Sequence, residues 1–163
     1  MSKLLPFCGL IFGILLAGCQ HLQKPVKLPR IDSVAMQFRS DESFKGIVEA
    51  FKRTESKGGK IILRTDPQQR AGLYFTVHFD HSVNLLPQDA KFKLYFITNL
   101  KPSVEVVTWE FHKGKSAPFL QNEVYLGITD NGNYNANTRL IAWKVELCRS
   151  DETIIAQKQS FAW

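Results

Sequence analysis

The sequence predicts a mainly β protein, an antiparallel β-sandwich of the immunoglobulin-like type. Short apolar runs recur along the chain, and in most of them large apolar residues alternate with polar ones, which is the period of a strand with one buried face. Turn residues separate these runs at intervals of roughly 8–16 residues. Helical patterns do not alternate with the runs, so a parallel βαβ sheet is not indicated. The Cys…Trp…Cys spacing of true immunoglobulin domains is absent.

The expected elements begin with a strand at residues 34–39 and one short helix or irregular segment near residues 41–53. In that segment large apolar residues at 44, 47, 48 and 51 have the spacing of one helical face, and Ser40 precedes them as a candidate cap. Gly46 weakens the helix, and an irregular strand is the alternative. The remaining runs are expected to form strands at residues 61–63, 73–79, 91–96, 105–111, 124–128, 141–147 and 153–156, with 160–163 closing the chain.

The last residues are expected to be part of the core. Phe161 and Trp163 stand at alternate positions, and no polar tail follows them. Because a disordered end rarely carries two large aromatic residues in this pattern, we expect both side chains to be mostly buried in a paired strand. The alternative is an exposed recognition tag.

Length and composition indicate one folded domain. The 163 residues are enough for one sizeable core, and a hydrophobic content of 44% with 12% aromatic residues excludes a disordered chain. Three cysteines are too few for a disulfide-stapled scaffold. The chain is therefore expected to depend on a hydrophobic core for its stability.

The first residues have the pattern of a secretory leader. Residues 4–17 are apolar throughout, Lys3 is the charge that precedes them, and the run is shorter than the roughly 20 residues of a membrane-spanning helix. It ends in Leu16-Ala17-Gly18-Cys19, which resembles the lipobox of bacterial lipoproteins.

This resemblance implies a lipid anchor. It implies a signal peptide over residues 1–18, diacylglycerol on the Cys19 sulfur and acylation of the new amine, hence palmitate-type chains in the membrane; two or more chains give stable anchoring. Gln20, in place of the Asp that favours retention in the inner membrane, implies the outer membrane and its periplasmic face. The alternatives are an ordinary signal peptide or an uncleaved anchor. Cys148 would then be the remaining thiol, and its apolar neighbours indicate a buried, structural one.

Residues 19–30 are expected to form the lipidated N-terminus and an extended tether, and residues 31–163 the β-sandwich domain. The tether holds two prolines and three basic residues with no acidic one, whereas residues 31–163 carry 17 basic and 15 acidic side chains. Basic side chains beside anionic lipid gain about 1 kcal/mol each. The near-neutral domain lacks a basic stripe interleaved with aromatic residues, so nucleic acid is not expected as a partner.

Candidate chemistry is sparse. His78 and Asp80 share one face of a strand with His81 on the other, and a metal site would need a further ligand such as His112. A polar strand face running into a turn is the simpler interpretation, and no metal or cofactor is expected.

The polar loop after residue 129 is a second candidate. Asn131, Asn133, Tyr134 and Asn135 carry side chains that orient sugar hydroxyls, although the Asn-Gly pair at 131–132 is above all a turn signal. Acidic residues are scattered over separate segments, so paired-carboxylate catalysis is not indicated. The aromatic residues at 74, 95, 109, 125 and 143 are core residues or members of an exposed row.

We therefore expect a non-catalytic, membrane-anchored lipoprotein of the cell envelope that binds another envelope component, a protein or a glycan. The alternative is a carbohydrate- or peptidoglycan-binding sandwich module. An envelope hydrolase is the third interpretation.

Lipidation gives the first testable prediction. Cys19→Ser removes the sulfur that would carry diacylglycerol, so the variant should accumulate as an unprocessed or soluble precursor that no longer incorporates labelled fatty acid. Fractionation and fatty-acid labelling measure this, with Cys148→Ser as the matched control that keeps its label. A cleaved Cys19→Ser protein that remained membrane-anchored would contradict the prediction.

Overall fold

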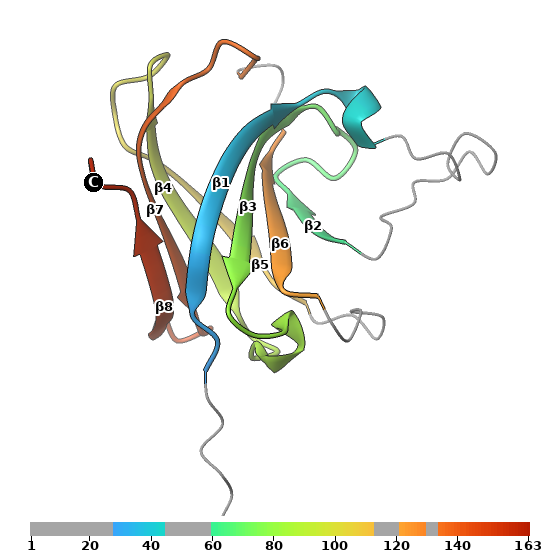
Figure 1. The fold of residues 1–163 in the computed structure, drawn as a ribbon, viewed down its shortest axis with the longest axis vertical. Helices are drawn as coiled ribbons and strands as arrows, with labels where there is room; N and C mark the ends of the chain where they lie inside the picture. Colours follow the sequence, from blue (N-terminus) through green and yellow to red (C-terminus); the bar gives the residue numbers. More distant parts are fainter. Residues whose placement is uncertain (1–27, 45–59, 113–120, 130–133) are drawn as a thin grey trace, which may run out of the picture.

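The computed structural model describes residues 28–44, 60–112, 121–129 and 134–163. Two four-stranded sheets stack face to face as a β-sandwich (Figure 1). The mainly β class predicted from the sequence is confirmed. The strands also lie close to their predicted positions, because the alternation of apolar and polar residues marks the buried face of a pleated strand.

Sheet A has the strand order β1-β3-β6-β2 and sheet B the order β5-β4-β7-β8. Neighbouring strands are antiparallel except β2 and β6, which are parallel. Sheet A consists of β1 (Ile31–Arg39), β2 (Ile61–Arg64), β3 (Gly72–Phe79) and β6 (Glu123–Ile128). Sheet B consists of β4 (Lys91–Thr98), β5 (Glu105–Glu110), β7 (Leu140–Cys148) and β8 (Ile154–Gln159).

Aromatic side chains fill the core between the sheets. Phe75 of sheet A packs on Phe96 of sheet B with ring centroids 6.0 Å apart, and Phe79 meets Phe92 at 6.2 Å. All four side chains are essentially inaccessible to solvent. Burying each such side chain contributes roughly 1.5–3 kcal/mol, so these contacts fix how the two sheets stack.

The segment expected as a helix is described in part. Two short 3-10 helices occur among the described residues, η1 (Asp41–Phe44) and η2 (Val83–Leu85). Of the expected helix or irregular segment near residues 41–53, η1 is the described part, and residues 45–53 lie outside the described residues.

The outer face of sheet A is more buried than alternation predicts. Tyr74 points away from the core and yet is 0% exposed, and its ring lies where a Cβ on Gly127 would approach it to 2.5 Å. Its hydroxyl donates to the Arg70 carbonyl (2.7 Å) and accepts from Arg64 Nε (2.9 Å). The glycine therefore makes room for the ring, and the outer face of the expected half-buried strand is fully buried at Tyr74 and partly exposed at Thr76 and His78.

The chain enters the sandwich through a polar clamp. Pro29 is buried, and the backbone N–H and Nε of Arg30 donate to the two carboxylate oxygens of Asp80, at 2.7 and 3.0 Å. The backbone N–H of Asp80 donates in return to the Arg30 carbonyl (3.1 Å). The clamp joins the start of β1 to the end of β3.

Cys148 is 1% exposed at the end of β7, so the expected buried thiol is confirmed. Burial is the main cause that raises the pKa of this thiol. A raised pKa keeps the group protonated at neutral pH and lowers its reactivity.

The prediction for the C-terminal residues is wrong for Phe161. β8 ends at Gln159, and Ser160 closes the ladder by donating its N–H to the Trp143 carbonyl (2.9 Å). The chain then turns, which breaks the alternation, and Phe161 is fully exposed. Trp163 is half-buried, but it lies on the outer face of sheet B, with its ring 6.0 Å from that of Tyr95.

Exposure of Phe161 gives the second prediction. Phe161→Ala should change the free energy of unfolding by less than about 0.5 kcal/mol, because the side chain buries nothing. Phe96→Ala, the matched core variant, should cost about 3–5 kcal/mol. Urea denaturation of both variants measures this, and a Phe161→Ala protein as unstable as Phe96→Ala would show that the C-terminal residues belong to the core.

Candidate functional site

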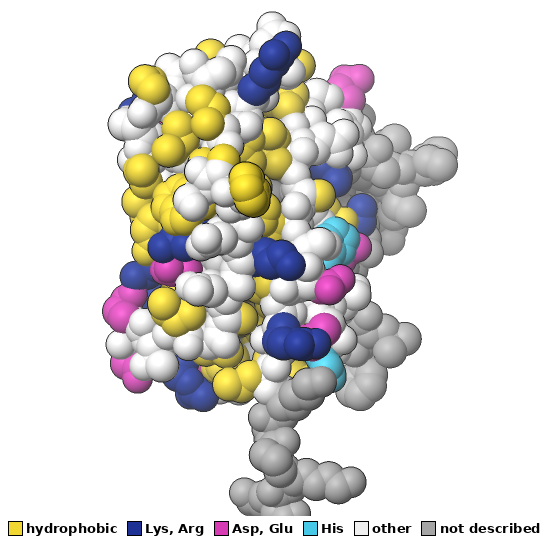
Figure 2. Space-filling view, turned by 60° about the vertical axis from the view of Figure 1, so that its left-hand side comes forward, with side chains coloured by type: hydrophobic (Ala, Val, Ile, Leu, Met, Phe, Trp, Pro, Cys, Tyr) yellow, Lys and Arg dark blue, Asp and Glu magenta, His cyan; other side chains and the backbone are white. Residues whose placement is uncertain are grey.

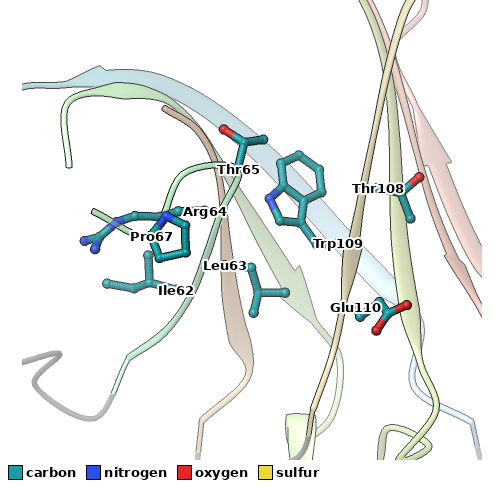
Figure 3. Close-up of a pocket in the computed structure, with 8 residues that line it drawn as sticks. All are labelled: Ile62, Leu63, Arg64, Thr65, Pro67, Thr108, Trp109 and Glu110. Carbon is teal, nitrogen blue, oxygen red and sulfur yellow. The ribbon is translucent and has the colours of Figure 1, made fainter. Parts of the chain in front are cut away.

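A cleft opens on one side of the sandwich, where the edge strand β2 of sheet A faces the edge strand β5 of sheet B (Figure 3). Its volume is about 400 Å³, within the range of ligand-binding pockets. The lining residues are Ile62, Leu63, Arg64, Thr65, Pro67, Thr108, Trp109 and Glu110.

Trp109 is the central side chain of the cleft. It points inward from β5 opposite Phe92, and 5% of it is exposed. In Figure 3 its indole nitrogen faces β2. The Nε1–H is buried, and the part of the chain that the structure describes provides no hydrogen-bond acceptor for it. Leaving a buried donor unsatisfied costs about 1–3 kcal/mol, so a ligand that brought an acceptor into the cleft would gain from this group.

The rim of the cleft is held in place by a hydrogen-bond network. Thr65 Oγ1 accepts from the backbone N–H of Thr129 (2.8 Å), while the Thr65 N–H donates to the Gly127 carbonyl (2.9 Å). Thr129 Oγ1 accepts from the N–H of Asp66 (3.0 Å) and donates to the carbonyl of the same residue (3.0 Å). These bonds fasten the start of the β2–β3 loop to β6, so Thr65 and Pro67 form a rigid wall.

The opposite wall is a strand edge. In an antiparallel ladder, residues that bond to the partner strand alternate with residues that direct N–H and C=O away from it. The N–H of Phe111 donates to the Ala90 carbonyl (2.8 Å) and fixes this alternation for β5. The backbone groups of Val106, Thr108 and Glu110 therefore point away from β4, and no strand among the described residues lies beside them.

The histidine and aspartate predicted as candidate ligands lie apart from this cleft. His78 is on the outer face of sheet A, with Nδ1 3.1 Å from a carboxylate oxygen of Glu123. Asp80 belongs to the clamp with Arg30, and His81 Nδ1 lies 2.9 Å from its carboxylate. His78, Asp80 and His81 are thus each engaged by a neighbouring side chain. His78 and Asp80 do not point into a common pocket where they could bind one metal ion.

Tyr134 and Asn135, the described candidates of the polar loop, lie at the opposite end of the sandwich from Asp80. The Tyr134 hydroxyl donates to Glu105 (3.1 Å), which also pairs with Lys101 (3.0 Å), beside a hollow of about 310 Å³. The side chain of Asn135 accepts from the backbone N–H of Asn137 (2.8 Å), as a turn residue does. Asn131 and Asn133 lie outside the described residues.

Metal ligands do not gather in the part of the chain that the structure describes. In these residues no group of three or more His, Cys, Asp or Glu side chains is close enough to hold an ion. His112, the further ligand considered with His78, lies beside Glu110 at 3.4 Å.

Among the residues that the structure describes, the aromatic side chains do not form a flat exposed row. Of those considered from the sequence, Tyr74, Trp109 and Tyr125 are buried. Tyr95 and Trp163 meet on sheet B with their ring planes tilted by 57°, and the Lys144 ammonium lies 4.3 Å from the centre of the Tyr95 ring. A sugar stacks on an open aromatic face, and here the ammonium occupies one.

Another part of the surface is apolar and exposed. In Figure 2, hydrophobic side chains gather over the upper part of the face on the β8 side, and charged groups lie mainly below them. Leu100, Val104, Val106, Ile141 and Phe161 are each more than half exposed. Nothing in the structure indicates what covers this surface, so the cleft is the better candidate for a defined site.

Sequence reasoning did not locate the cleft. From the sequence, Trp109 is one of several aromatic residues assigned either to the core or to an exposed row. Leu63 belongs to a predicted strand and Pro67 to a predicted turn. One usable signal was present: the run at 105–111 combines β-branched and aromatic residues and contains no Lys or Pro. Such a composition at an edge indicates an interaction strand, but the sequence does not show which strands are edges.

No protein-family model, curated protein or solved structure matches this chain.

Across the described residues, the structure contains no helix with the length and hydropathy needed to span a membrane.

The clamp gives a prediction on pH. The backbone N–H of Arg30 is the main cause that holds the pKa of Asp80 well below its usual range, and His81 and the Arg30 side chain add to it. The stability that Asp80 contributes is therefore present above its unfolded-state pKa of about 3.9 and is lost as the pH falls toward the lower folded-state value.

Asp80→Asn should lower the free energy of unfolding at pH 7 and flatten its decline in acid below about pH 4. Urea denaturation at a series of pH values measures both effects. Asp32→Asn, an exposed position on β1, is the control and should follow the parent protein. An Asp80→Asn variant with the parent's acid dependence would mean that the clamp does not stabilise the fold.

Proposed function

We propose that the protein is a non-catalytic lipoprotein of the cell envelope, anchored through Cys19, that binds another envelope component in the cleft between β2 and β5. The observation that carries this proposal is the Trp109 Nε1–H, which is buried at the wall of the cleft and for which the described residues provide no acceptor. A tryptophan with a purely structural role usually donates its N–H to a protein acceptor or to water.

We also propose an immunoglobulin-like variant of the sandwich. In such domains strands A, B, E and D form one sheet, and strands C, F and G form the other, to which variable-type domains add C′ and C″. The order β5-β4-β7-β8 agrees with C′-C-F-G, and β1-β3-β6 agrees with A-B-E. β2 takes the place of strand D, although it precedes strand B along the chain and pairs in parallel with β6. This difference distinguishes the proposed topology from the standard one.

The engagement of acidic side chains supports a binding role over catalysis. Glu105 contacts Lys101 and Tyr134, while Glu123 contacts His78. Glu110 is the carboxylate that lines the cleft, and its side chain is 65% exposed. Its neighbour is His112 at 3.4 Å, and both side chains are mostly exposed to solvent, whereas general acid–base chemistry uses groups enclosed in a site.

The alternative is a carbohydrate- or peptidoglycan-binding module. The fully exposed Phe161 ring, with Tyr95 and Trp163 on the same sheet, is the observation in its favour. Against it, the two paired rings are tilted and the Lys144 ammonium lies over Tyr95. The cleft likewise presents the edge of one indole ring rather than an open aromatic face.

Photo-cross-linking in cells tests the function. A benzophenone amino acid at Thr108, on the outer face of the edge strand β5 beside the cleft, should give adducts with an envelope component, whereas the same group at Gln157, exposed on β8, should not. Equal adducts from both positions, or none from Thr108, would contradict the proposed cleft. Adducts that form at Phe161 instead, and that a muramidase digests, would favour the glycan-binding alternative.

A further inference from the structure

We propose that the outer edge of β5 receives an extended segment of a partner protein, which adds to sheet B as a fifth strand and places alternate side chains in the cleft. This inference rests on the proposed function, since it names the kind of component that the cleft binds. The backbone, side chains and charge of β5 support it independently.

The backbone of β5 offers a row of unpaired groups. Val106, Thr108 and Glu110 direct their N–H and C=O groups away from β4, and the described residues provide no partner for them. Such a row recurs at the spacing of an extended peptide, whose own N–H and C=O groups match it. Sugars and small metabolites do not present donors and acceptors with this repeat.

The β5 edge also lacks most of the features that keep edge strands from pairing, and its two charged residues, Glu105 and Glu110, stand at its ends. Edge strands are protected by lysines, bulges, prolines or short length. β8 carries the exposed Lys158 and a register irregularity beside Cys148, and β1 has an irregularity near its start. β2 has four residues. β5 has six regularly paired residues, β-branched at three successive positions, and contains no Lys or Pro.

The cleft supplies side-chain recognition for the added strand. Successive side chains of a strand point to opposite faces. Every second residue of the segment would therefore enter the space between Trp109 on one side and Leu63 and Pro67 on the other. The Trp109 N–H requires an acceptor there, which a backbone carbonyl or a hydroxyl or amide side chain supplies.

Charge restricts the segment further. Both charged residues of β5, Glu105 and Glu110, are acidic. Glu105 is engaged by Lys101 and Tyr134. Glu110, with the exposed His112 as its neighbour at 3.4 Å, is 65% exposed and is the carboxylate presented to a partner. The expected segment alternates apolar or small polar residues with solvent-facing ones and carries a Lys or Arg opposite Glu110.

The test uses random peptides longer than the six residues of β5, displayed on phage and selected on the full-length protein in detergent. Selected sequences should show the alternation and a basic residue. Their synthetic forms should slow hydrogen exchange of the Val106, Thr108 and Glu110 amides, measured by NMR. The amides of β8 should not change, since that edge is not used.

Two variants separate strand addition from other binding. Thr108→Pro removes one outward N–H at a position where edge strands tolerate proline, and should weaken peptide binding by at least about tenfold; Thr108→Ala keeps the N–H and is its matched control. Trp109→Phe removes the indole N–H and keeps an aromatic ring, and should weaken binding roughly fivefold. Thermal melting of each variant shows whether it folds. If Thr108→Pro does not fold, Trp109→Phe still tests the inference.

The outcomes are distinguishable from failure of the proposed function. If cross-links form at Thr108 in cells but no peptide is selected, or selected peptides leave the β5 amides unprotected, the cleft binds a component and strand addition is wrong. Binding that withstands both Thr108→Pro and Trp109→Phe overturns the inference as well. Protection of the same amides on concentration alone, with doubling of the mass, would identify a second copy of this chain as the occupant and overturn the proposal of a different partner.

Discussion

Two open sheets stacked face to face leave four strand edges, and each edge carries backbone groups that must be paired, covered or exposed to water. In this protein the edges meet in pairs. β1 and β8 contact each other on one side, where a lysine and two register irregularities interrupt the edges. β2 and β5 face each other on the other side across a cleft. Because the sandwich is closed on the β1–β8 side and open on the β2–β5 side, the candidate site lies at the β2–β5 side.

Alternation of apolar residues predicted most of the fold. The run from Leu73 to Phe79 and the run from Phe92 to Phe96 place their aromatic residues in the core as expected, because a pleated strand between two sheets has one buried face. Strand pairing was less predictable. A four-residue strand such as β2 carries too little pattern to show that it pairs in parallel with β6, far along the chain. Burial of Tyr74 on the outer face also depended on a distant glycine at 127.

The candidate site was harder to predict than the fold, for a physical reason. His78, Asp80 and Tyr134 attract attention because their side chains ligate metals, protons or sugars, but each forms an ion pair or hydrogen bond with a nearby residue. The proposed site depends on the edge backbone of β5 and on one indole N–H that finds no acceptor among the described residues. Backbone groups are the same in every residue, so only the three-dimensional arrangement shows which are unpaired.

The clamp between Arg30 and Asp80 has a mechanical consequence. If the chain is anchored at Cys19 and held by a partner at β5, as proposed, tension between the two would enter the fold at residue 30, where the chain joins β1. Tension along β1 acts parallel to the strand, so the ladder bonds to β3 share the load in shear rather than opening one after another. The Arg30 contacts to Asp80 lie at the point where the load arrives. These contacts would therefore be the first to break. Their breaking would release a short length of chain before the load reached the strands of the sandwich.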